Sequence, residues 1–95
     1  MTTYLIVLAT ITNEEKWTQY RKAVVPLIQT FGGRHISRGG NAQLLEGTHE
    51  SWRVAMFEFP SMDAIREFWN SPEYRDVKEL RRDAATLEVW AVPGE

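Results

Sequence analysis

Residues 4–11, YLIVLATI, form a run in which nearly every position is apolar. The run is rich in β-branched side chains and ends at a polar cluster, so it is predicted to be a β-strand. Because alternate side chains of a strand point to opposite faces, both faces of this strand need an apolar cover. Helices can cover one face, but a chain of 95 residues has no second sheet to spare for the other.

The segment after this strand has the pattern of an amphipathic helix. Thr12 and Glu15 match a capping box at its start. Apolar side chains then recur at three- and four-residue spacing: Trp17, Tyr20, Val24, Leu27, Ile28 and Phe31. Pro26 removes one hydrogen bond inside this pattern and predicts a kink or an irregular last turn. Gly32 or Gly33 supplies the left-handed residue that ends the helix.

The next part of the chain is rich in glycine and is predicted to contain two strands. Residues 34–38 begin the first strand, which resumes at 42–46 after a bulge or bend at the glycine pair 39–40. Residues 52–59 form the second strand. Its alternation places on one face Trp52, Val54, Met56 and Glu58, and on the other Arg53, Ala55, Phe57 and Phe59.

A second helical layer and a last strand complete the pattern. One helix begins after Ser61, and another begins after Ser71 with Pro72 in its first turn. Residues 86–92 form the fourth strand. The order β-α-β-β-α-β predicts one α+β domain over residues 1–95, a ferredoxin-like sandwich whose four-stranded antiparallel sheet carries helices on one face.

The other face of such a sheet would be a large exposed apolar surface on an isolated chain. Surfaces of this kind mark contacts with other proteins. We therefore predict a homodimer in which two copies close their open sheet faces on each other, since a two-fold contact lets one patch cover its own copy.

A set of short motifs, specific in combination, runs over nearly the whole chain. They are Tyr20 with Pro26, Gly32-Gly33-Arg34, Arg38-Gly39-Gly40, Leu45-Glu46-Gly47, Glu58-Phe59-Pro60-Ser61, Ser71-Pro72-Glu73-Tyr74 and Arg81. On these motifs the chain resembles the DUF1330 family, small bacterial proteins within the dimeric α+β barrel superfamily. The resemblance implies a ferredoxin-like fold and a dimeric barrel.

The resemblance implies little about activity, because the family is named for having no established function. Its superfamily includes cofactor-free oxygenases, haem-degrading enzymes, lactone isomerases, aldoxime dehydratases and ligand sensors, whose ligand pockets lie between the sheet and its helices. The chain departs from the family at position 35, which is histidine where the family usually has an aromatic or aliphatic residue. A catalytic role of His35 would therefore be peculiar to this protein.

The composition argues against several classes of function. A formal net charge of −2 provides no concentrated basic surface for nucleic acid. The chain has no cysteine, and its two histidines lack the spacing of metal ligands, so neither disulfides nor a metal site is expected. The N-terminal apolar run is too short to span a bilayer and follows no basic leader, so we expect a cytoplasmic protein without membrane contact.

Three side chains are candidates for acid–base chemistry. Histidine has an unperturbed pKa near neutrality, so His35 would act as general acid or base if it faced a pocket; otherwise it is a hydrogen-bonded residue of the sheet or the dimer contact. Glu58 is a carboxylate on an otherwise apolar strand face. Arg38 could hold a substrate carboxylate by two parallel hydrogen bonds. The alternative is a structural ion pair of Glu58 with Arg38, Arg34 or Arg53.

Aromatic side chains are the candidates for ligand binding. Those on the inward stripes of the predicted helices would line a pocket between helices and sheet: Trp17, Tyr20, Phe68, Trp69 and Tyr74. The alternative is that they simply fill the core.

These observations support two hypotheses. In the first, a homodimer binds a small aromatic or carboxylate-bearing metabolite between sheet and helices. It performs isomerisation, dehydration or oxygenation without a cofactor, with Glu58 or His35 as proton carrier and Arg38 as anion clamp. In the second, the chain is a non-catalytic dimeric ligand-binding or assembly module. A polar-ended cavity of roughly a few hundred cubic ångströms would favour the enzyme, and solid packing the module. Haem binding is a third alternative.

Overall fold

The computed structural model describes residues 2–48 and 53–94. The elements follow in the order β1 (Thr3–Ile11), α1 (Glu14–Thr30), β2 (Arg34–Asn41), β3 (Arg53–Phe59), α2 (Met62–Trp69), α3 (Pro72–Lys78), a short 3₁₀ helix η1 (Glu79–Arg81) and β4 (Ala85–Pro93). This is the predicted β-α-β-β-α-β order, with the second helical segment divided between α2 and α3.

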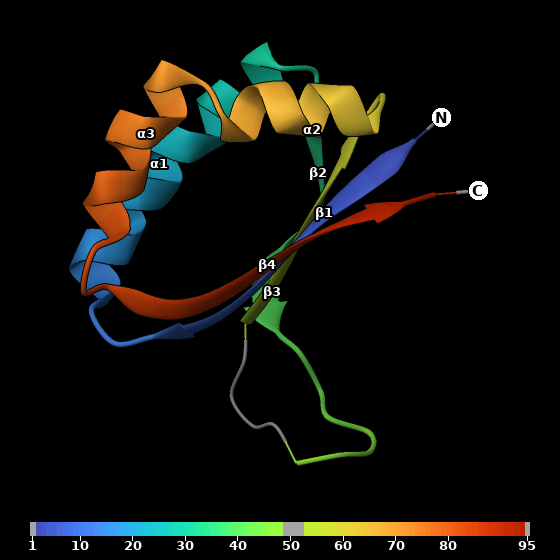
Figure 1. The fold of residues 1–95 in the computed structure, drawn as a ribbon. Helices are drawn as coiled ribbons and strands as arrows, with labels where there is room; N and C mark the ends of the chain where they lie inside the picture. The colour runs from blue at the N-terminus through green and yellow to red at the C-terminus, as the bar shows by residue number, and fades with distance from the viewer. Residues whose placement is uncertain (1, 49–52, 95) are drawn as a thin grey trace.

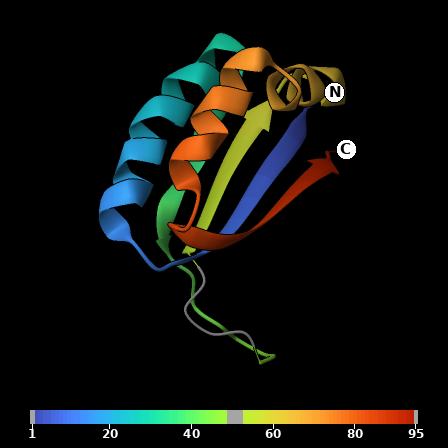
Figure 2. The same cartoon turned by 60° about the vertical axis from the view of Figure 1, so that its left-hand side comes forward.

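The strands form one antiparallel sheet in the order β2-β3-β1-β4, and the helices pack on one of its faces (Figure 1 and Figure 2). β1 and β4 pair along their whole lengths, from Thr3 opposite Pro93 to Ile11 opposite Ala85. β1 therefore lies inside the sheet with a partner strand on each side, as a strand that is apolar on both faces requires. The predicted α+β sandwich is confirmed.

Asn13, rather than the predicted Thr12, caps the start of α1. Its side-chain oxygen accepts a hydrogen bond from the amide of Lys16 at 3.1 Å. The backbone amides of Thr12 and Asn13 donate to the carbonyl of Ala84 at 2.8 and 3.0 Å. Thr12 is thus held in the corner that ties the end of β1 to the start of β4, and the helix begins one residue later than predicted.

The other helix boundaries agree with the sequence. α1 continues through Pro26 as one helix and ends before Gly32, whose φ of 91° is the left-handed conformation of a terminating glycine. The side chains of Ser61 and Ser71 cap α2 and α3, each accepting a hydrogen bond at 3.1 Å from an amide three residues later.

β2 runs without a break to Asn41, which corrects the prediction that the strand would stop at residue 38 and resume at 42–46. Its pairing with β3 shifts register between Arg38 and Asn41, so the predicted irregularity at the glycine pair 39–40 is present. Asn41 pairs with Arg53, the first residue of β3, and residues 42–46 lie outside any strand.

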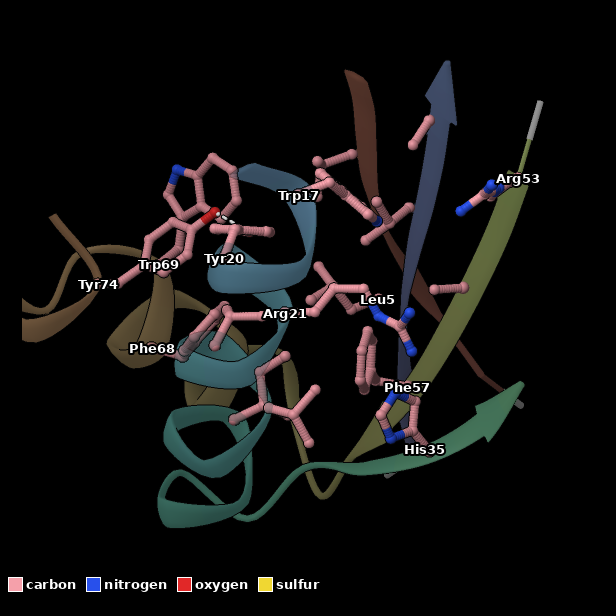
Figure 3. Close-up of a pocket in the computed structure, with 17 residues that line it drawn as sticks. Leu5, Trp17, Tyr20, Arg21, His35, Arg53, Phe57, Phe68, Trp69 and Tyr74 are labelled. Carbon is pink, nitrogen blue, oxygen red and sulfur yellow. Dashed lines mark hydrogen bonds between the residues drawn. The ribbon is translucent and has the colours of Figure 1, made fainter. Parts of the chain in front are cut away.

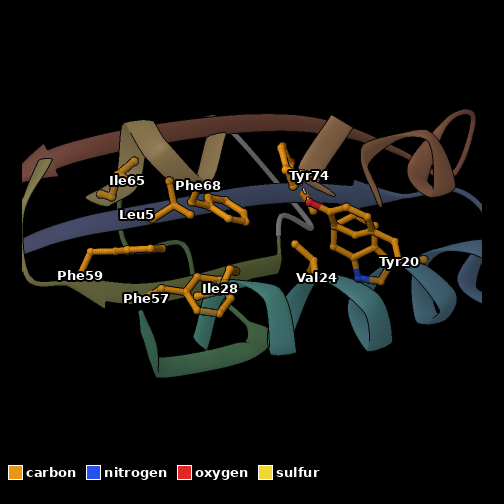
Figure 4. Packing of buried hydrophobic residues seen from close by; sticks show 11 residues of the cluster. Leu5, Tyr20, Val24, Ile28, Phe57, Phe59, Ile65, Phe68 and Tyr74 are labelled. Carbon is orange, nitrogen blue, oxygen red and sulfur yellow. Dashed lines mark hydrogen bonds between the residues drawn. The ribbon is translucent and has the colours of Figure 1, made fainter. Parts of the chain in front are cut away.

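The core lies between the sheet and the helices (Figure 4). It is built from side chains of β1, β3 and the three α-helices: Leu5, Ala9, Trp17, Tyr20, Val24, Ile28, Phe57, Phe59, Ile65, Phe68 and Tyr74. Gly33 is fixed by this packing, because a methyl group there would lie 2.5 Å from Cγ2 of Ile28 and 2.8 Å from Cζ of Phe59. Position 33 therefore needs glycine for space.

The opposite face of the sheet, which we call the open face, carries no helix in the part of the chain that the structure describes (Figure 1). The register places Ile6 of β1 between Met56 of β3 and Trp90 of β4, which makes an apolar row across this face. The Trp90 side chain is 56% exposed. The bare apolar face expected from the sequence is thus present.

Candidate functional site

A small cavity lies between the helices and the sheet (Figure 3). Its volume is about 50 Å³, and we call it the inner chamber. It is lined by Leu5, Val7, Ala9, Trp17, Tyr20, Arg21, Val24, Val25, Ile28, His35, Arg53, Ala55, Phe57, Phe68, Trp69, Tyr74 and Val89. Most of these side chains are apolar, so the few polar groups decide what the chamber can bind.

Three basic side chains reach the inner chamber from different elements, Arg21 from α1, His35 from β2 and Arg53 from β3. Arg53 is already engaged, because its guanidinium donates two hydrogen bonds to the carboxylate of Glu14. Within residues 2–48 and 53–94, no hydrogen bond or ion pair engages the Arg21 side chain. The His35 ring packs on Phe57, with 4.3 Å between ring centres. The charge of Arg21 is therefore available to an anion in the chamber.

Two tyrosine hydroxyls form a second polar group in the inner chamber. The hydroxyls of Tyr20 and Tyr74 lie 3.0 Å apart in a buried hydrogen bond (Figure 3). Burial, followed by the neighbouring Tyr74, raises the pKa of Tyr20 well above its usual range, so its hydroxyl stays protonated. The guanidinium carbon of Arg81 lies 5.8 Å from the centre of the Tyr20 ring. The Tyr20 hydroxyl is therefore a neutral donor or acceptor rather than a base.

Replacing Tyr74 by phenylalanine is expected to lower the free energy of unfolding by about 1–2 kcal/mol, because the buried Tyr20 hydroxyl loses this partner. Urea unfolding followed by circular dichroism measures the change. Tyr4→Phe is the matched control, since Tyr4 lies on β1 outside both the core and the inner chamber. Equal effects of the two substitutions would contradict a stabilising role for the hydroxyl pair.

A second cavity adjoins the inner chamber, between α2 and the strands β1 and β4. Its volume is about 240 Å³, and we call it the outer chamber. It is lined by Leu5, Met62, Ile65, Arg66, Trp69, Asn70, Val89 and Ala91. Leu5, Trp69 and Val89 line both cavities, so these three side chains form the wall between the two chambers.

Glu58 does not line either chamber. Its neighbours Phe57 and Phe59 are buried beneath the helices, so the alternation of β3 places Glu58 on the open face. There its carboxylate accepts a hydrogen bond from Nε of Arg34, which lies opposite it on β2. Glu58 and His35, the two candidate proton carriers, therefore occupy opposite faces of the sheet. A catalytic role of Glu58 on its own face stays a prediction.

Arg38 was predicted to be the anion clamp, and its backbone lies in β2 opposite Ala55. Its side chain falls outside the described part of the chain, as does residue 52, which was predicted to begin β3. The role of Arg38 therefore stays a prediction.

The predicted ligand-binding residues do lie together. All of them line the inner chamber, from α1, α2 and α3: Trp17, Tyr20, Phe68, Trp69 and Tyr74. Whether they contact a ligand stays a prediction. The sequence reasoning missed Arg21, although its position four residues after Trp17 and three before Val24 places it on the apolar stripe of α1.

Residues 2–48 and 53–94 contain neither a cluster of metal ligands nor a membrane-spanning helix. No group of three histidine or acidic side chains in these ranges could hold a metal ion. None of the helices they form is long and apolar enough to cross a bilayer.

Solved structures share this architecture. A protein of unknown function from Rhodopseudomonas palustris matches with a TM-score of 0.80 and 23% identity, over 99% of this chain and 83% of that one. SnoaB, a cofactor-independent oxygenase from Streptomyces nogalater, matches with a TM-score of 0.66 and 12% identity, over 99% and 93%. A dimeric protein of unknown function and ferredoxin-like fold from Bacteroides fragilis matches with a TM-score of 0.64 and 17% identity, over 98% and 96%. The predicted ferredoxin-like fold is confirmed.

Family membership follows from the sequence itself. No protein of curated function matches the chain. The model of the family described as a domain of unknown function, DUF1330, matches residues 2–95. The match extends over nearly the whole chain, as the short motifs indicated, and the protein therefore belongs to the DUF1330 family.

Proposed function

We propose that the inner chamber binds the carboxylate, or a similar small anionic group, of a metabolite. The observation that carries this proposal is Arg21, a guanidinium that lines a mostly apolar chamber and that no described acidic side chain neutralises. A guanidinium donates two parallel hydrogen bonds to a carboxylate, and apolar walls strengthen such bonds by lowering the local dielectric constant. Arg53 contributes less to anion binding, because its guanidinium already forms an ion pair with the carboxylate of Glu14.

The size of the inner chamber favours a carboxylate over an aromatic ring. Its volume of about 50 Å³ offers room for roughly three or four water molecules, whereas cavities that admit benzene measure about 150 Å³. Of the two ligand classes predicted from the sequence, the carboxylate-bearing metabolite fits. An aromatic ring would have to displace lining side chains such as Phe68 or Trp69.

The chemistry that we propose is proton transfer without a cofactor. His35 is the proton carrier, since it lines the same chamber as Arg21. It takes a proton from the carbon next to a carbonyl group, the electron pair moves onto the oxygen, and Arg21 stabilises the resulting enolate. Where a second double bond is conjugated with the enolate, the electron pair moves back from the oxygen and the proton returns to the far end of that double bond, which completes an isomerisation. The likeness of the fold to SnoaB, a cofactor-independent oxygenase, supports chemistry of this kind on such a scaffold.

The second candidate is a non-catalytic dimeric ligand-binding module. The small volume of the inner chamber favours it, because little space remains for a substrate that must move during a reaction. Proton exchange in deuterated water separates the two candidates. A catalyst exchanges the protons next to the carbonyl of 2-oxobutanoate and loses this activity in His35→Ala, whereas a module binds the compound without exchange.

We also infer that the protein acts as a cytoplasmic homodimer joined through the open face. The apolar row of Ile6, Met56 and Trp90 supports this contact, and a similar structure is described as dimeric. The absence of cysteine favours a reducing compartment. The two chambers lie on the helix side of each sheet, so dimerisation leaves them open to ligands.

Replacing Arg21 by glutamine is expected to weaken butanoate binding about 10- to 100-fold, the effect of losing hydrogen bonds between charged partners. Shifts of backbone amide signals in an NMR titration give the affinity. Lys22→Gln removes the same charge from the next residue of α1, which lines neither chamber, and should leave the affinity nearly unchanged. If both variants weaken binding equally, the anion is attracted by general charge and the proposed site is wrong.

A further inference from the structure

The two chambers lie along one line across the sheet. On the helix face, the register places His35 of β2 opposite Phe57 of β3, Phe57 opposite Leu5 of β1, and Leu5 opposite Ala91 of β4. His35, Phe57 and Leu5 line the inner chamber, and Leu5 and Ala91 line the outer one. With strands about 4.8 Å apart, this row spans roughly 14 Å from His35 to Ala91.

The wall between the chambers is formed by the three residues that line both. Leu5 and Val89 rise from the sheet, and Trp69 comes from α2 above them. The Trp69 ring lies against Tyr74, 5.1 Å between ring centres, and the Lys78 ammonium group lies 4.9 Å from its centre. A chain that passes from one chamber to the other must therefore run past Leu5, Val89 and Trp69.

The chambers differ in polarity. The inner chamber holds Arg21 and His35 at one end of the row. The outer chamber is lined at the other end by apolar side chains such as Met62, Ile65 and Ala91. Its arginine, Arg66, is largely exposed and lies 3.5 Å from Asp63, so it does not supply a second unpaired charge.

The volumes of the two chambers also indicate that one ligand occupies both. The inner chamber, at about 50 Å³, accommodates little more than a carboxylate, and the outer chamber adds about 240 Å³. Joined, they approach the lower end of the range of about 300–1,000 Å³ found for small-molecule sites. A ligand that fills both would carry its charge at one end and its apolar surface at the other.

We propose that the ligand is an unbranched, medium-chain monocarboxylate that lies across the strands. Its carboxylate binds Arg21 beside His35, and its hydrocarbon chain passes beneath Trp69 into the outer chamber as far as Ala91. This inference rests on the proposed function, since it needs the carboxylate in the inner chamber. It adds the class of the ligand and a site for its tail.

The test compares butanoate, hexanoate and octanoate in NMR titrations of the wild-type protein and two variants. In the wild type, the affinity is expected to rise about fourfold for each added methylene that becomes buried. Ala91→Trp fills the outer chamber from an exposed position and should abolish this rise while leaving butanoate binding unchanged. Gln19→Trp places the same side chain on an exposed site of α1 that lines neither chamber, and it should keep the rise.

The outcomes distinguish the two proposals. Butanoate binding that depends on Arg21 but does not increase with chain length would overturn the tail site and leave the proposed function standing. A rise that persists in Ala91→Trp would also overturn it, because the chain would then bury its methylenes elsewhere. If no alkanoate of any length binds, both proposals fail.

Discussion

Replacing Phe68 by alanine is expected to lower the free energy of unfolding by about 3–5 kcal/mol, the cost of deleting a fully buried aromatic ring. Phe68 is 1% exposed, and its ring contacts those of Phe31, Phe59 and Tyr74 at 6.0, 5.9 and 4.6 Å between centres. It therefore joins α2 to the C-terminal end of α1, to β3 and to α3 in one cluster. A domain has a total stability of about 5–15 kcal/mol, so the loss should consume much of it.

Urea unfolding at one fixed protein concentration measures this loss, since association would make the midpoint depend on concentration. Phe31→Ala makes the same chemical change at a partly buried site beside Phe68 and should cost less. A cost below about 1 kcal/mol for Phe68→Ala would contradict the tight packing of this ring in the core.

The fold could be predicted because several local signals agree. The apolar run of β1, the serine caps of α2 and α3, and Gly32 each specify one local structure, and together they permit one topology. Two element boundaries were predicted wrongly. Asn13 caps α1 in place of Thr12, because the backbone amides of both residues are held by the carbonyl of Ala84, and residues 42–46 lie outside any strand.

The candidate site was harder to predict than the fold. The alternation of side chains along β3 predicts two sets on opposite faces but does not indicate which set faces the helices. Phe57 and Phe59 lie on the buried face because their burial removes more apolar surface from water than burial of Val54 and Met56 would. Glu58 alternates with them and therefore lies on the open face. The larger aromatic content of one set is a signal that would have placed Glu58 correctly.

Arg21 shows a different difficulty. An arginine beside Tyr20 on an amphipathic helix is ordinarily assigned to solvent, and its residue is indeed largely exposed. Its long side chain nevertheless extends along apolar surface to line the inner chamber. The position of the residue on the apolar stripe indicates this, but only the packing of α1 over β2 and β3 shows that the guanidinium has no acidic partner among the described residues.

Replacing Ile6 by aspartate is expected to convert a homodimer into a monomer. Ile6 lies in the middle of the apolar row on the open face, between Met56 and Trp90. In a two-fold contact each dimer would bury two such carboxylates. If each costs about 2 kcal/mol or more, the dissociation constant should rise about a thousandfold.

Light scattering coupled to size exclusion measures the mass, which should fall from that of two chains to that of one chain of 11.0 kDa. Gln19→Asp adds the same charge at an exposed position of α1, outside the core. Because α1 packs on the face of the sheet opposite the open face, this variant should leave the dimer intact. Circular dichroism must show that Ile6→Asp retains its helices, because an unfolded variant would lose the dimer for another reason. A folded Ile6→Asp protein that remains dimeric would place the dimer contact on another surface. The apolar row of Ile6, Met56 and Trp90 would then need a different partner.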